Sequence, residues 1–405
     1  MDFWEKLVCS YKAFTYHFIR LDLPPMAENI IARGNFCFLL NPERISSCFL
    51  VKTHRLFDPV SAGGIEIMLS RLFILFTLSA LLTGCAYFRS GSEGTDTSGY
   101  SLSQVQADMR PIDLNQPYQP TKNIDAYFNF YDLNFTNVQH WFGTVKSEGS
   151  TLAAHAFMPE NPRGTLFLIH GYFDHTGTLS KLIAESLNQG YAVVAWDLPG
   201  HGLSSGDRTD TGQFHLCAEQ FFDIVERSNQ KLPHPMHVIA HSTGCSIAIE
   251  YLHNPDPYVF ERMVFLAPLI RHTYWGWGKF GYAISNPFIN QVRRRDKKNS
   301  NDEAYLAFVK KDPLHNSTLS YDYLGDLYQW EKQIRNAPVW SGSICVIQGD
   351  KDSIVKWKYN LPFMETKVEN LEVHIIPGAK HQLANEIEAY RTQTFDLIFQ
   401  YLEKP

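Results

Sequence analysis

The stretch "HVIAHSTGCSIAIEY", residues 237–251, decides the fold because it joins a buried strand to a helix through one serine. The apolar run "HVIAH" ends directly at Ser242, and "TGCSIAIEYL" continues with helical character. A serine nucleophile needs such a sharp strand-to-helix turn with small neighbours, because strand and helix crowd together there. Ala240 and Gly244 are these neighbours. We therefore predict that Ser242 is a nucleophile.

A literal G-x-S-x-G motif occurs elsewhere, at "GLSSG" (residues 202–206), with Ser204 at its centre. The strand before it ends near Asp197, and the polar run "SGDRTDT" follows in place of a helix. Ser204 therefore lacks the context that a nucleophile elbow requires. We interpret the literal match as a decoy, although Ala240 replaces the first glycine of the motif at Ser242.

The partners of a serine on such an elbow follow it in the order acid, then histidine. The strand "SICVIQ" ends in "GDKDSIV", which offers Asp350 and Asp352, and the strand "LEVHIIP" ends in "GAKHQL", which offers His381. Residues just past the ends of parallel strands reach the same rim of the sheet. We predict His381 as the base and favour Asp352 over Asp350 as the acid that orients it. His374 lies mid-strand and is expected to be packed or solvent-facing.

An oxyanion hole needs two backbone N–H groups that point at the developing negative charge. One belongs to Thr243, the residue after the nucleophile, and the loop "HGYFDH" supplies the other from Tyr172. The alternative that His170 is the catalytic base is disfavoured, because its place in this loop indicates a structural role. Four residues are expected to support the two motifs: His170, Gly171, His241 and Gly244.

Short apolar runs alternate with helical segments through the rest of the chain, after two strands around a turn at Glu148-Gly149. The runs are "TLFLIH", "YAVVAWD", "HVIAH", "RMVFLAP", "SICVIQGD" and "LEVHIIPG". This alternation predicts an α/β protein with a mostly parallel central sheet and helices on both faces.

One insertion of about 70 residues interrupts the alternation, and its size after a core strand predicts a cap over the site at about 271–338. It is dense in aromatic residues, which either pack the cap onto the body or line an acyl pocket. They are Tyr274, Trp275, Trp277, Phe280, Tyr282 and Phe288. The basic run "RRRDKK" (293–298) is either a solvated face or a contact for an anionic headgroup.

Five segments together resemble the α/β-hydrolase superfamily: "LIHGYFDHTG", "WDLPGHGLSSGDR", "IAHSTG", "GDKDSIV" and "GAKHQL". Their G-H-G-x-S and A/G-H-S-x-G patterns resemble, more narrowly, the monoacylglycerol lipase and lysophospholipase group. The resemblance covers about residues 121–405 and implies hydrolysis of a lipid-like ester with no cofactor and no metal. It implies that Ser242 attacks the ester, His381 carries the proton and Asp352 orients the histidine.

Two other functions stay open. A peptidase of the proline-iminopeptidase type uses the same triad, and an acidic subsite for a free amine would favour it. A binding lipoprotein without activity is the alternative outside the enzymes, although intact Ser242, Asp352 and His381 argue against it. Haloalkane dehalogenases and epoxide hydrolases are disfavoured because their elbow carries aspartate.

The segment "MLSRLFILFTLSALLTGCAYF" (68–88) indicates a lipid anchor that follows a signal peptide, and not a membrane-spanning helix. Its apolar run, 72–82, is shorter than the roughly 20 residues that span a bilayer and fits the core of a signal peptide. The ending at Cys85 resembles a bacterial lipobox, so we predict a signal peptide at 68–84 and a lipidated Cys85. A short buried helix is the alternative.

The regions beside this signal are interpreted from it and from composition. Residues 1–67 are predicted to be an upstream extension from a mis-assigned start at Met1 in place of Met68. Residues 85–120 are predicted to be the lipidated cysteine and a flexible tether, and 121–405 the catalytic domain. Ala86 lacks the aspartate linked to inner-membrane retention, which favours the outer membrane, facing the periplasm.

Charge and cysteine usage exclude two further classes of function. The net charge of -6 and a pI near 6.2 give no general attraction to nucleic acid. The seven cysteines show no C-x-x-C pair and no metal-ligand spacing, so no metal site is predicted.

Overall fold

The structure, a computed structural model, describes residues 101–253, 257, 260–293 and 297–404. The predicted extension, signal peptide and lipidated Cys85 lie outside these described residues and stay predictions. Within the described ranges, no helix has both the length and the apolar character that crossing a bilayer needs.

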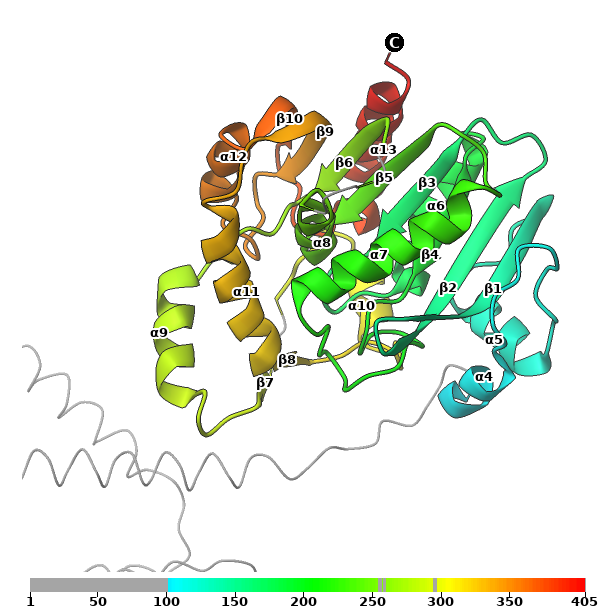
Figure 1. The fold of residues 1–405 in the computed structure, drawn as a ribbon, viewed down its shortest axis with the longest axis horizontal. Coiled ribbons are helices and arrows are strands. Elements are labelled where there is room, and N and C mark those ends of the chain that lie inside the picture. The colour runs from blue at the N-terminus through cyan, green and yellow to red at the C-terminus, as the bar shows by residue number, and fades with distance from the viewer. Residues whose placement is uncertain (1–100, 254–256, 258–259, 294–296, 405) are drawn as a thin grey trace, which may run out of the picture. The chain divides into compact units, whose positions relative to one another are not determined.

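Eight strands form the central sheet in the order β1-β2-β4-β3-β5-β6-β9-β10 (Figure 1). Their bounds are β1 Val138–Ser147, β2 Ser150–Pro159, β3 Thr165–Ile169, β4 Ala192–Trp196, β5 Met236–His241, β6 Arg262–Leu266, β9 Trp340–Gly349 and β10 Val368–Ile376. The β1–β2 and β2–β4 pairs are antiparallel, and all other neighbours are parallel. The predicted mostly parallel sheet is confirmed.

The predicted turn between the first two strands is confirmed as well. Glu148 and Gly149 connect β1 to β2, with φ angles of 45° and 73°. A two-residue hairpin turn of this kind needs positive φ at both positions, because only then does its twist match that of the strands.

The sheet is covered on both faces because alternate side chains of its strands enter two separate hydrophobic clusters. In β3, Phe167 and Ile169 belong to one cluster, and Leu166 and Leu168 belong to the other. Helices α7 (Phe214–Asn229), α8 (Thr243–Tyr251) and α12 (Trp357–Glu365) contribute to the first cluster. Helices α5 (Lys122–Phe130), α6 (Ser180–Asn188) and α13 (Glu388–Leu402) contribute to the second. The parallel strands are therefore buried on both sides, which explains their unbroken apolar runs.

The insertion predicted as a cap lies between β6 and β9. Its elements are α9 Trp275–Ser285, β7 Gln291–Arg293, α10 Glu303–Val309, β8 Thr318–Ser320 and α11 Tyr321–Ile334. Strands β7 and β8 pair as a small antiparallel sheet, and α9 lies beside α11 (Figure 1). We call these residues, 271–338, the cap.

The folded region begins earlier than predicted, because part of the expected tether is packed. Helix α4 (Leu102–Asp108) buries Val105 completely, and Met109 enters the same hydrophobic cluster. The chain then runs beside β1, where the Thr144 N–H donates to the Arg110 carbonyl at 2.8 Å. The prediction of a flexible tether to residue 120 is therefore wrong for residues 102–120. The segment is polar in composition, but Val105 in α4 and Met109 just after this helix are apolar and buried.

Candidate active site

Ser242 occupies the turn between β5 and α8 in a strained conformation. Its φ is +51° and its ψ is −110°, a region that residues other than glycine seldom adopt. The Ser242 N–H donates to the Leu266 carbonyl at 2.9 Å. The Ser242 carbonyl accepts from the N–H groups of Cys245 (3.1 Å) and Leu269 (3.2 Å). Backbone bonds to β6 and to the segment after it thus hold the elbow in place, as strained sites require.

The small residues around the serine have different reasons to be small. A Cβ atom at Gly244 would lie 2.4 Å from the Ile169 carbonyl oxygen and 2.8 Å from that of His170, so the helix start leaves no space for a methyl group. Ala240 is fully buried in a hydrophobic cluster, where its methyl group is packed. Glycine is therefore needed after the serine, while alanine is tolerated before it.

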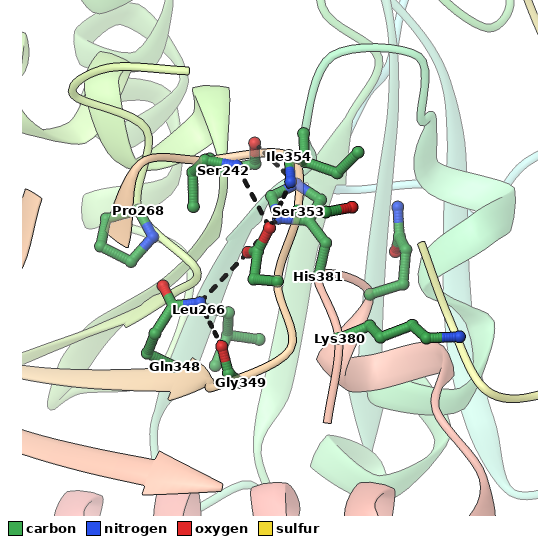
Figure 2. A network of polar contacts seen from close by, with 12 residues as sticks. Ser242, Leu266, Pro268, Gln348, Gly349, Ser353, Ile354, Lys380 and His381 are labelled. Carbon is green, nitrogen blue, oxygen red and sulfur yellow. Dashed lines mark hydrogen bonds and ion pairs between the residues drawn. The ribbon is translucent and has the colours of Figure 1, made fainter. Parts of the chain in front are cut away.

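Ser242, His381 and Asp352 are buried and joined by polar contacts. Figure 2 labels Ser242 and His381 in this network. The Nε2 atom of His381 lies 3.1 Å from Ser242 Oγ. The Nδ1 atom of the same ring lies 2.7 Å from Asp352 Oδ2. With the proton on Nδ1, the ring donates to the carboxylate, and Nε2 is left to accept the serine proton. This is the arrangement of a serine nucleophile, a base and an orienting acid.

Asp352 is held as a carboxylate by donors on both of its oxygens. Besides His381, Oδ2 accepts from Gln348 Nε2 at 3.1 Å. Oδ1 accepts from the backbone N–H groups of Ile354 (2.7 Å) and Val355 (3.1 Å). Burial opposes ionisation, but His381 and these donors outweigh it, so the pKa of Asp352 lies below its ordinary value.

The residues disfavoured from the sequence are engaged elsewhere. The Asp350 carboxylate accepts from the Gly378 N–H at 2.7 Å. His374 lies 2.6 Å from Glu372 on the half-exposed surface of β10. The Ser204 hydroxyl donates to the Asp197 carbonyl at 2.6 Å and accepts from a backbone N–H of β2, so it braces a loop.

The predicted motif-support residues are buried and closely packed near the serine. A Cβ at Gly171 would lie 2.8 Å from His241 Nδ1, so the loop needs glycine to approach the elbow. His170 accepts from the Leu198 N–H at 2.9 Å, which is a structural role. Both ring nitrogens of His241 face oxygens, one of Asp174 at 3.2 Å and one of the His381 carbonyl at 3.1 Å. His241 thus contacts the backbone of the residue proposed as base.

The two residues predicted to form the oxyanion hole, Tyr172 and Thr243, border the same pocket as Ser242. A cap residue, Tyr323, contacts both. Its ring stacks on that of Tyr172 with centroids 3.9 Å apart, and its hydroxyl lies 2.7 Å from Thr243 Oγ1. The Tyr172 hydroxyl also accepts from the N–H of Ser320 in the cap at 3.0 Å. The cap therefore contacts the side chains of both residues predicted to form the oxyanion hole. Sequence reasoning missed Tyr323, because its contacts lie far away in the chain.

A pocket of ≈ 350 Å³ opens above the serine, between the body and the cap. Its wall is mainly aliphatic and aromatic, with Leu269, Val292, Leu319, Leu324, Leu327, Ile354, Tyr274 and Tyr328. Two cationic side chains, Arg293 and Lys297, also line it, and no aspartate or glutamate does among the described residues. A pocket of this size with an apolar wall accepts a small amphiphilic molecule.

The described part of the chain has no cluster of metal-ligating side chains and its cysteines are buried. There, no three His, Cys, Asp or Glu residues are grouped so that they could hold a metal ion. The three described cysteines are free and buried: Cys217, Cys245 and Cys345. Burial raises the pKa of the Cys217 and Cys345 thiols to about 12, so neither is a reactive thiolate.

The sheet, the strained serine between β5 and α8, and the cap over it define a hydrolase of the α/β-hydrolase class. More specifically, the chain belongs to the family described as serine aminopeptidase S33, which matches residues 160–388, more than half of its length.

Individual relatives agree with this class. A monoacylglycerol lipase of Mycolicibacterium smegmatis is 26% identical over 269 residues, covering 63% of this chain and 94% of the relative. The "Probable lysophospholipase L2" of Haemophilus influenzae is 22% identical, covering 61% of this chain and 87% of the relative. The solved structure of a monoglyceride lipase from Saccharomyces cerevisiae is similar in fold, with a TM-score of 0.57 at 18% identity over 64% of this chain and 94% of that one.

Proposed function

We propose that this chain hydrolyses the acyl ester of a single-chain glycerolipid. The family and the relatives support a carboxylic ester hydrolase. The catalytic residues and the lipid substrate are our proposal. Ser242 is the nucleophile, His381 the general base and acid, and Asp352 the group that orients the histidine.

The proposed reaction follows from the contacts of these three residues. His381 Nε2 takes the proton of Ser242 Oγ as the oxygen attacks the ester carbonyl. The N–H groups of Tyr172 and Thr243 receive the charge that develops on the carbonyl oxygen. The histidine then gives its proton to the departing alcohol, which leaves an acyl-serine. A water molecule, deprotonated by the same nitrogen, releases the fatty acid and restores the serine.

The pocket lining favours an ester over an amino-terminal peptide. A peptidase that removes terminal residues must bind a protonated amine, and carboxylates are the groups that pair with it. Instead, Arg293 and Lys297 line the described pocket, beside an aliphatic wall. Cations repel an ammonium group, whereas the wall fits an acyl chain. This charge pattern is the observation on which the proposal rests.

An exposed apolar face on α9, the helix that also contributes Gly278 to the pocket lining, supports a lipid-like substrate. Trp277, Phe280 and Ile284 project from α9 at helical spacing, and Phe288 follows. Trp277 is 79% exposed and Phe288 77% exposed. Soluble proteins seldom expose such groups together unless the surface has a partner. We call these four residues the α9 apolar face and propose that it meets a lipid surface.

The membrane attachment remains a proposal from the sequence. We propose that Cys85 is lipidated and holds the domain at the outer membrane, facing the periplasm. Intact-mass analysis of the protein from its native membrane tests this. A mass that begins at Cys85 with added acyl chains would support it, and a species that retains residues 1–84 would contradict it.

The function is tested with a chain-length series of nitrophenyl esters, a monoacylglycerol and an amino-acid arylamide. Ser242→Ala is expected to lose at least ~10³-fold in kcat. Ser204→Ala is the matched control, expected to stay active but to unfold at a lower temperature because it loses two buried hydrogen bonds. Cleavage of the arylamide alone, or activity that survives in Ser242→Ala, would contradict the proposal.

A further inference from the structure

Arg293 and Lys297 line the pocket that holds the candidate nucleophile, Ser242. Neither has a role in the proposed hydrolysis of an uncharged ester. Arg293 ends β7, where its backbone pairs with Thr318 of β8, and it is exposed. Lys297 follows in the chain and lines the same pocket. Ester attack, proton transfer and acyl binding need no positive charge here. The pair therefore calls for a separate account.

The position of Lys297 is set by groups next to the catalytic loop. Its ammonium donates to the Ser353 carbonyl at 3.1 Å and lies 4.5 Å from the centre of the Tyr274 ring. Ser353 is the residue after Asp352, so the ammonium is held at the loop that carries the candidate acid.

The charge of Lys297 affects the ionisation of another residue of the pocket lining, His272. His272 is largely desolvated, and burial together with Lys297 lowers the pKa of its ring to about 4. His272 is thus neutral at physiological pH, so its ring adds no positive charge to that of Lys297 and Arg293 in the pocket lining.

We propose that Arg293 and Lys297 form a subsite for the phosphate of a lysophospholipid headgroup. This inference rests on the proposed ester hydrolysis and names its substrate. A lysophospholipid joins an acyl ester to a phosphodiester through one glycerol unit, which matches an aliphatic wall beside two cations. Guanidinium and ammonium groups are the usual partners of phosphate. A monoacylglycerol has the same acyl ester without a charge that this pair could bind.

The test compares two short-chain substrates below their micellar concentrations, so that no lipid surface contributes. One is a hexanoyl lysophosphatidylglycerol and the other is monohexanoylglycerol, each assayed with the full chain. Arg293→Gln and Lys297→Gln are each expected to lower kcat/KM by about tenfold on the phosphate substrate, the scale of one lost hydrogen bond to a charged group. The loss on the neutral ester is expected to be several-fold smaller than the loss on the phosphate substrate. Thermal unfolding of the same samples reports that the variants are folded.

Lys298→Gln is the matched control. It removes the same charge one residue away, but its ammonium pairs with Glu303 at 2.8 Å and does not line the pocket. It is expected to change neither substrate. Equal losses on both substrates, or no loss on the phosphate substrate, would overturn the subsite while leaving ester hydrolysis intact. If the variants differ from wild type only on anionic vesicles, the cations attract a membrane and the subsite is also refuted. A wild type that is inert on both esters would instead refute the proposed function.

Discussion

Replacing Asp352 by asparagine tests the proposed triad most sharply, because every partner of this carboxylate is a donor. Oδ2 accepts from His381 and Gln348, while Oδ1 accepts from two backbone N–H groups. An asparagine has a single oxygen. Whichever way its amide turns, the NH2 group faces two donors.

The two orientations differ in cost, and the cheaper one inactivates the enzyme. With NH2 toward the backbone, the N–H groups of Ile354 and Val355 lose their acceptor, at about 1–3 kcal/mol each. With NH2 toward His381, the ring relieves the conflict by moving its proton from Nδ1 to Nε2. The proton on Nε2 then prevents this nitrogen from accepting the proton of Ser242. We therefore expect a fall of about 10⁴-fold in kcat, or about 5.5 kcal/mol, with a modest loss of stability.

The assay is hydrolysis of a soluble nitrophenyl ester, with thermal unfolding measured on the same samples. Asp350→Asn is the matched control. The Asp350 carboxylate accepts a hydrogen bond from Gly378 and lies near Lys351, whereas Asp352 contacts the histidine. It is expected to keep kcat within about threefold, as for a surface change. If Asp352→Asn keeps more than a tenth of wild-type kcat, or if both variants lose the same amount, the assignment of the acid is wrong.

Three other perturbations follow from the geometry. Asp312→Asn breaks a fully buried contact of 2.9 Å with His175 and is expected to cost about 3–5 kcal/mol of unfolding free energy near pH 6. Burial opposes protonation of His175, but Asp312 outweighs burial and raises the pKa of His175. The stabilisation is therefore complete below pH 6.5 and is lost as the pH rises through the folded-state pKa. Melting curves from pH 6 to 9 measure this loss. Gly244→Ala places a methyl group against a strand carbonyl and is expected to cost about 1–3 kcal/mol and most of kcat, measured by unfolding and ester assays. Trp277→Ser with Phe280→Ser is expected to lower hydrolysis of vesicle-borne ester several-fold and to leave a soluble ester unchanged.

Each of these has a clear contrary outcome. The buried pair is misassigned if the pH dependence of the melting temperature is the same in Asp312→Asn and in wild type. A fully active and stable Gly244→Ala would mean that the elbow has more space than its contacts indicate. Equal loss on soluble and vesicle-borne ester in the Trp277 and Phe280 double variant would assign these residues to the pocket instead of a lipid surface.

Local signals in the sequence explain why the sheet and the elbow could be predicted. Buried parallel strands leave unbroken apolar runs in the sequence. Ser242 is the single residue between "HVIAH" and the helical stretch, so no other residue could occupy the turn. The candidates for acid and base follow from their positions just past strand ends. The sequence could only favour one acid over the other, because Asp350 and Asp352 stand two positions apart in one loop. The contact of Asp352 with His381 distinguishes them.

Contacts between distant segments could not be predicted in the same way. Tyr323 and Thr243 are 80 positions apart, and no spacing rule connects them. The cap aromatics illustrate the same limit. Trp275 is buried and Trp277 is exposed, although both stand in one short helix that is apolar nearly all round. The packed segment at 102–120 was missed because composition averages over a few decisive side chains, here Val105 and Met109.

The contacts of Tyr323 with Tyr172 and Thr243 mean that the cap cannot be exchanged without a change beside the serine. A chimera that replaces residues 271–338 with the cap of a relative would exchange the substrate wall and remove the contacts with Tyr172 and Thr243 together. Such a graft would need a tyrosine at the same place in α11 to keep its rate. In this chain, a change of cap is therefore expected to alter substrate range and turnover together, because Tyr323 belongs to the cap and contacts Tyr172 and Thr243.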